Sequence, residues 1–123
     1  MDRALNEAAV AALVAEQLAQ IADQRVVDVL SKYLVPPRPC LLEWDYGHPH
    51  PEFPEPKYPG FIVMEHPGSG TGIAYSDYGS GPDMPWVLIA IEHPRFGMDS
   101  SWFDSLEDAF QNSFASNELS TAR

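Results

Sequence analysis

The sequence predicts an α+β domain, with an antiparallel sheet of about four strands and a long N-terminal helix and a C-terminal helix packed on one face. Three observations predict it: a start free of Gly and Pro, several β-rich runs separated by Gly and Pro turns, and an amphipathic segment near the C-terminus. At 123 residues the chain has the size of one domain with one core, and we expect residues 1–123 to form a single domain.

Residues 1–35 form the predicted helical segment. The stretch from Asp2 to about Leu34 contains neither Gly nor Pro and is rich in Ala, Leu, Gln and Glu, all good helix formers. Its apolar residues recur at three- and four-residue steps and form one stripe. Asn6 is suited to cap the start, and Asp23 offers a second start, so one helix or two remain open alternatives. Pro36 and Pro37 end the segment.

The sheet is expected within residues 39–92. Strand-like runs occur at 39–46, 60–66, 71–77 and 86–92, and Pro67-Gly68-Ser69-Gly70 has the composition of a four-residue hairpin loop. Residues 86–92 are almost continuously apolar, which predicts a central strand covered on both faces. Residues 47–60 contain five prolines and are expected to form a loop, because a central strand cannot accommodate them.

A C-terminal helix is predicted over residues 100–116, beginning at Ser100 or Ser101. Its apolar residues, among them Trp102, Phe103, Leu106 and Phe110, share one face at helical spacing. Ser105 and Asp108 also have the spacing of a capping box, which leaves the start of the helix open. Residues 117–123 are expected to be a polar tail.

The charge of the chain is strongly negative. Seven Lys and Arg residues against eighteen Asp and Glu residues give a formal net charge of -11. A nucleic-acid-binding protein needs a basic patch that displaces counterions from the phosphates, so a nucleic-acid partner is not expected. Residues 36–99 alone carry nine acidic and three basic residues. We therefore expect a protein partner that is basic or neutral.

Composition also bears on compartment and cofactors. Cys40 is the only cysteine, so an internal disulfide or a cysteine zinc site cannot form. The first residues lack the apolar core of a signal peptide, and no apolar run approaches the length of a membrane span. We expect a cytoplasmic protein that has no membrane partner and no cofactor.

The histidines are the candidates for chemistry. His48 and His50, with Glu52 nearby, have residue types that bind transition metals, but the extended backbone at Pro49 directs alternate side chains to opposite sides. His66 and His93 each follow a Glu at the end of a predicted strand, and they could form an acid/base pair if the strands are neighbours. An ordinary exposed loop is favoured for His48 and His50, and a half-buried structural role is favoured for His66 and His93. No catalytic or metal-binding residue is predicted, which argues against an enzyme.

Aromatic and acidic residues share two of the predicted loops, a combination that is typical of protein-binding surfaces. The leading hypothesis is a non-enzymatic, acidic protein-binding domain, for example a bacterial immunity or inhibitor protein. One alternative is a small enzyme or ligand-binding domain with a pocket that uses His66 and His93. Another is a structural subunit of a homo-oligomer, so the protein is expected as a monomer or homodimer. The candidate binding residues are Trp44, Asp45, Tyr46, Phe53, Glu55, Tyr58, Asp77, Tyr78 and Asp83.

Overall fold

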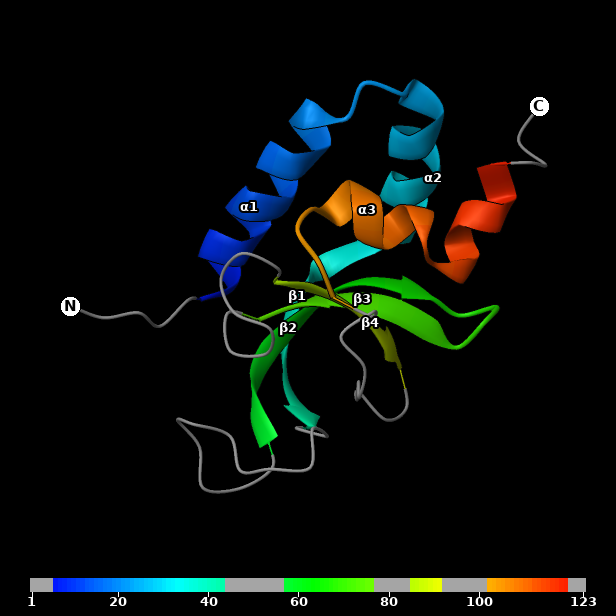
Figure 1. The fold of residues 1–123 in the computed structure, drawn as a ribbon. Helices are drawn as coiled ribbons and strands as arrows, with labels where there is room; N and C mark the ends of the chain where they lie inside the picture. Colours follow the sequence, from blue (N-terminus) through cyan, green and yellow to red (C-terminus); the bar gives the residue numbers. More distant parts are fainter. Residues whose placement is uncertain (1–5, 44–56, 77–84, 92–101, 120–123) are drawn as a thin grey trace.

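The computed structural model describes residues 6–43, 57–76, 85–91 and 102–119 (Figure 1). Helices come first, a sheet follows, and two short helices end the described part of the chain. The elements are α1 (Glu7–Gln20), α2 (Gln24–Tyr33), β1 (Leu34–Glu43), β2 (Lys57–His66), β3 (Thr71–Tyr75), β4 (Trp86–Ala90), β5 (Trp102–Phe103), α3 (Leu106–Gln111) and the 3-10 helix η2 (Phe114–Leu119). This is the predicted α+β class.

The N-terminal segment forms two helices, which settles the alternative that the sequence left open. Asn6 caps α1, and its side chain accepts a hydrogen bond from the N–H of Ala9 at 2.8 Å. Ile21 is extended, and Asp23 then caps α2 by accepting from the N–H of Arg25 at 3.0 Å. Such side-chain acceptors satisfy N–H groups that the first turn of a helix leaves unpaired.

The five strands form one antiparallel sheet in the order β1-β2-β3-β4-β5, so each strand pairs with the next one along the chain. β1 begins at Leu34, five residues before the predicted start, and it includes Pro36 and Pro37. An edge strand tolerates prolines because one of its sides makes no backbone hydrogen bonds to a neighbouring strand. The register accordingly shifts between Leu34 and Arg38. β4 is an interior strand as expected, whereas β3 is the middle one.

A bulge in β2 reverses which side chains face the helices. Ile62 pairs with Ala74 and Met64 pairs with Ile73, so Val63 is one extra residue on β2. Val63 and Met64 consequently lie in the same buried cluster although they are adjacent in sequence. Because side chains alternate along a strand, a single extra residue changes the face of everything beyond it. The bulge thereby places His66 on the face that the helices cover.

Both faces of the sheet are apolar and buried. One face packs against α1, α2 and α3, which lie together on that side (Figure 1). The core on this side includes Val10, Leu30, Val63, Ile73 and Phe110. The opposite face carries a second cluster in which every member is at most 3% exposed. This cluster consists of Leu42, Ile62, Ala74, Val87, Ile89 and Trp102.

The C-terminal segment differs from the single helix predicted over 100–116. Trp102 and Phe103 form strand β5 and pair with Val87 and Trp86, so their helical spacing was misleading. The helix α3 begins only at Leu106, where Ser105 caps it by accepting from the N–H of Asp108 at 3.1 Å. Residues 117–119, which the sequence assigned to the tail, belong to η2. Bulky aromatic residues occur on the apolar faces of both strands and helices. Here their burial on the sheet determines that Trp102 and Phe103 form a strand.

Candidate functional site

The predicted binding surface falls almost entirely outside the described residues. Trp44, Asp45, Tyr46, Phe53, Glu55, Asp77, Tyr78 and Asp83 lie there, as do His48, His50 and His93. Tyr58 is described in its backbone, which belongs to β2 and pairs with Leu42 of β1. These assignments therefore remain predictions.

The described strands do show where the two acidic segments begin and end. The pairs Glu43–Lys57 and Tyr75–Trp86 lie at the same end of the sheet, because all neighbouring strands are antiparallel. Buried Ser76 joins the bases of the two segments: its hydroxyl donates to the Pro59 carbonyl at 2.8 Å, and its N–H donates to the Pro85 carbonyl at 2.9 Å. Residues 44–56 and 77–84 thus leave from one end of the sheet, which we call the loop end.

Two aromatic residues at the loop end have structural roles. The rings of Tyr75 and Trp86 meet edge to face with centroids 4.9 Å apart, and both side chains are buried. Edge-to-face pairs stabilise a core beyond the apolar area that they bury. These buried rings stabilise the sheet at the loop end.

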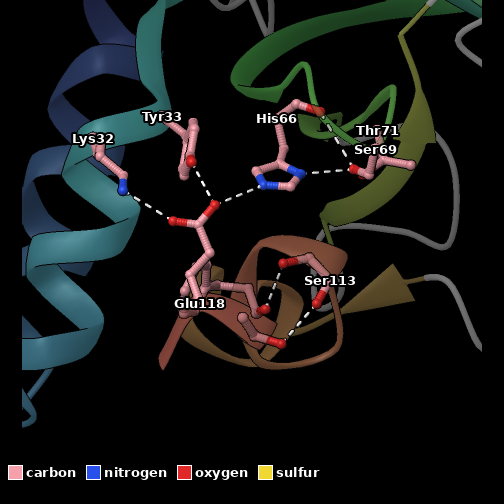
Figure 2. Close-up of polar contacts among 9 residues, drawn as sticks. Lys32, Tyr33, His66, Ser69, Thr71, Ser113 and Glu118 are labelled. Carbon is pink, nitrogen blue, oxygen red and sulfur yellow. Dashed lines mark hydrogen bonds and ion pairs between the residues drawn. The ribbon is translucent and has the colours of Figure 1, made fainter. Parts of the chain in front are cut away.

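The opposite end of the sheet holds a polar cluster centred on Glu118 (Figure 2). The carboxylate accepts hydrogen bonds from Lys32 Nζ at 2.9 Å, from the Tyr33 hydroxyl, and from His66 Nε2 at 3.0 Å. The three donors come from the end of α2 and the end of β2, whereas Glu118 belongs to η2. One side chain therefore connects three elements; we call Lys32, Tyr33, His66, Ser69, Thr71 and Glu118 the polar cluster.

Electrostatics in the polar cluster favour an ionised Glu118. Hydrogen bonds from Tyr33, Lys32 and His66 lower the pKa of Glu118 to about 2. The same carboxylate raises the pKa of Tyr33 and that of Lys32, chiefly through their hydrogen bonds with it. Glu118 is therefore a charged hydrogen-bond acceptor at neutral pH.

The hydrogen bond with an ionised Glu118 also determines the tautomer of a neutral His66 ring. A carboxylate can only accept, so His66 Nε2 must carry the hydrogen of that bond. In the neutral ring, Nδ1 is then an acceptor, and the Ser69 hydroxyl lies 2.7 Å from it. The Thr71 hydroxyl lies 2.7 Å from Ser69 Oγ on the other side. The result is a continuous chain from Thr71 through Ser69 and His66 to Glu118 (Figure 2).

The imidazole is held in place by packing as well. The ring of Tyr33 meets the His66 ring edge to face at 4.7 Å, and the His66 side chain is only 12% exposed. Ser69, by contrast, is exposed in the turn between β2 and β3. A partly buried, oriented imidazole therefore lies behind an accessible hydroxyl.

A hollow adjoins the polar cluster at Thr71. Its volume is about 200 Å³, and most of its lining is apolar. Phe114 forms part of the rim and is 59% exposed. The lining residues are Thr71, Leu88, Ile89, Ala90, Asn112, Ser113 and Phe114.

The other sequence-based interpretations have mixed outcomes. Ile91, two residues before His93, donates its N–H to the Gly70 carbonyl at 2.9 Å, but His93 itself is not described. Within the described ranges, no group of three or more His, Cys, Asp and Glu side chains could hold a metal ion. In the same ranges, no helix is long and apolar enough to cross a membrane. Cys40 lies in β1, and burial raises its pKa to about 11.

Comparisons with known proteins find no match among protein-family models, curated proteins or solved structures.

Sequence reasoning identified His66 but missed its partners. Glu118 was placed in the tail, and Ser69 was interpreted only as a turn residue. No local spacing connects them, because Glu118 is 52 positions from His66. The one usable signal was His66 three residues before Ser69, which matches their contact across a tight turn.

Proposed function

We propose that this protein is an acidic protein-binding domain whose partner surface is at the loop end of the sheet. The observation that carries the proposal is the joining of the two segment bases by Ser76, described above. Segments that leave from one end of a sheet are in position to form a shared recognition surface. Their sequences contain five acidic residues, no Lys or Arg, and several aromatic residues.

The charges elsewhere in the described part strengthen the proposal. Each Lys or Arg side chain that the structure describes is paired with a carboxylate of the same chain. These ion pairs are Arg25–Asp23, Lys32–Glu118 and Arg38–Glu65. The positive charges are thus locally neutralised, while exposed carboxylates such as Glu7, Glu16 and Asp28 are not in these pairs. The field presented to a partner is negative, which favours association with a basic surface.

An inhibitor of the immunity type is the concrete form of this proposal. Such a protein covers a basic active cleft with carboxylates and gains association rate through electrostatic steering. Aromatic residues such as Trp44, Tyr46 and Tyr78 would supply the buried anchors that carry most of the binding energy.

The test compares two variants with the same change in net charge. Each variant replaces four carboxylates by amides. The loop variant changes residues of the two loop-end segments, and the helix variant changes residues on the helices. The loop variant carries Asp45→Asn, Glu55→Gln, Asp77→Asn and Asp83→Asn; the helix variant carries Glu7→Gln, Glu16→Gln, Asp28→Asn and Glu107→Gln. Each protein is immobilised and exposed to a lysate of the native cells at low and high ionic strength, and the bound proteins are identified by mass spectrometry.

The expected result is a protein that wild type and the helix variant capture at low salt, that high salt releases, and that the loop variant does not retain. Equal capture by both variants would contradict a specific loop-end surface. Failure of wild type to retain any protein at low salt would contradict the proposed function as a whole.

A further inference from the structure

We propose that Ser69 is a nucleophilic serine that accepts an acyl group from small, uncharged, activated acyl donors, with His66 as the base and Glu118 as a positioning residue. The site lies at the hairpin end of the sheet, opposite the loop end, and the inference does not depend on the proposed binding function.

The hydrogen-bond chain supplies the chemistry. A serine hydroxyl is a weak nucleophile until a neighbouring base takes its proton, and the base is most effective when a third group orients it. Ser69 Oγ lies 2.7 Å from His66 Nδ1, and His66 Nε2 lies 3.0 Å from Glu118 Oε2. Both distances are within hydrogen-bonding reach, and the ionised Glu118 leaves Nδ1 as the acceptor that proton transfer requires.

The serine hydroxyl is accessible to a substrate, whereas the imidazole that would act as its base is shielded from solvent. Ser69 is exposed, whereas His66 behind it is shielded by Tyr33 and by its carboxylate partner. The Ser69 hydroxyl contacts Thr71, which forms part of the apolar hollow beside Leu88 and Phe114. A volume of about 200 Å³ suits a short apolar acyl chain. The net charge of -11 disfavours anionic donors.

The transfer step balances as an ordinary acylation. Ser69 Oγ forms a bond to the acyl carbon as the hydroxyl proton passes to His66 Nδ1. The bond from the acyl carbon to the leaving group breaks, and the leaving group departs with the electron pair and takes the proton. Water then attacks the acyl carbon and gives a proton to His66 Nδ1. The bond from the acyl carbon to Ser69 Oγ breaks, Oγ keeps the electron pair and takes the proton back from His66, and a carboxylic acid leaves.

The turn geometry limits the donors to activated ones. The N–H groups of Ser69 and Gly70 both donate to the His66 carbonyl, at 3.2 and 3.1 Å, so they are engaged in the turn. Preorganised N–H donors are usually what stabilises the oxyanion of an acyl transfer. With those two engaged, activated esters are expected to react and peptide bonds are not.

The first experiment uses p-nitrophenyl butyrate as the probe. We expect a burst of p-nitrophenolate and a butyryl adduct, which peptide mass spectrometry locates at Ser69. Ser69→Ala abolishes both, whereas Ser31→Ala, which removes an exposed hydroxyl on α2, leaves both unchanged. An adduct on another residue, or an equal burst in Ser69→Ala, would overturn the proposal.

The second experiment separates the action of His66 from its structural role. Ser69→Cys in a Cys40→Ala background introduces a single thiol, and its alkylation rate by iodoacetamide reports the fraction of thiolate. Replacing His66 by Gln in this background is expected to lower that rate by about tenfold or more. Circular dichroism and thermal unfolding verify that both proteins are folded. A rate that is insensitive to His66→Gln in folded protein would show that the imidazole does not act as a base.

Discussion

Glu118 of η2 lies 3.0 Å from His66 of β2, carboxylate Oε2 to imidazole Nε2, although 52 positions separate the two residues. The same carboxylate also accepts from Lys32 and Tyr33 at the end of α2. One carboxylate therefore links η2 to α2 and to β2. Loss of its negative charge is expected to weaken the attachment of η2 to the rest of the fold.

Acid should destabilise the protein through Glu118. Its pKa in the folded protein is about 2, below the ordinary value of 4.5. A group with a lowered folded pKa contributes stability that is complete above its unfolded pKa and is lost as the pH falls toward the folded pKa. We therefore expect the urea midpoint of wild type to decrease between about pH 5 and pH 2, and Glu118→Gln to decrease less. Glu16→Gln serves as the control and should follow wild type.

Two phenylalanines near the C-terminus should respond very differently to truncation. Phe110 of α3 is fully buried, whereas Phe114 is 59% exposed. Phe110→Ala is expected to lower the free energy of unfolding by about 3–5 kcal/mol, because it removes buried area and leaves a cavity. Phe114→Ala should change it by only about 0.5 kcal/mol. Chemical denaturation of both variants measures the difference, and equal losses would contradict the packing described for α3.

Gly72 should tolerate no side chain. A Cβ there would lie 2.2 Å from the Met64 carbonyl oxygen, beside the bulge of β2. Gly72→Ala is therefore expected to lower the free energy of unfolding by about 1–3 kcal/mol or more. At Gly68 the nearest atom to a new Cβ is His66 Cε1 at 3.8 Å, an ordinary contact. Gly68→Ala is the matched control and should leave the unfolding temperature nearly unchanged.

Cys40 should be a slow thiol in the folded protein. Burial raises its pKa to about 11, and the thiolate is the reactive form. Alkylation by iodoacetamide at pH 8 is expected to be at least about tenfold slower in the folded protein than in urea. Comparable rates in the two conditions would show that β1 does not shield the thiol.

The sequence was sufficient for the elements whose signals are local. Asp23 marked a second helix start, and the residues 67–70 marked a hairpin turn that the structure contains. Ser105 and Asp108 had the right capping spacing for α3, although the predicted helix began too early. Caps and turns involve only a few neighbouring residues, so they can be predicted from the sequence without knowledge of the fold.

The polar cluster could not be predicted in the same way. His66 faces the helices only because Val63 is an extra residue in β2, and strict alternation would have placed it on the other face. Trp102 and Phe103 likewise belong to the sheet because they pair with β4. This is a tertiary contact, which the helical spacing of the apolar residues does not indicate. The contact of Glu118 with His66 therefore depends on a bulge that no local pattern indicates.

The chain-order sheet has a consequence for how the molecule assembles. Each strand pairs with the one before it in the chain, so β1 to β4 can pair successively during synthesis. Glu118 can contact Lys32 only after the 86 residues that follow Lys32 have been synthesised. The contact between η2 and α2 therefore forms only after all five strands and α3 have been synthesised.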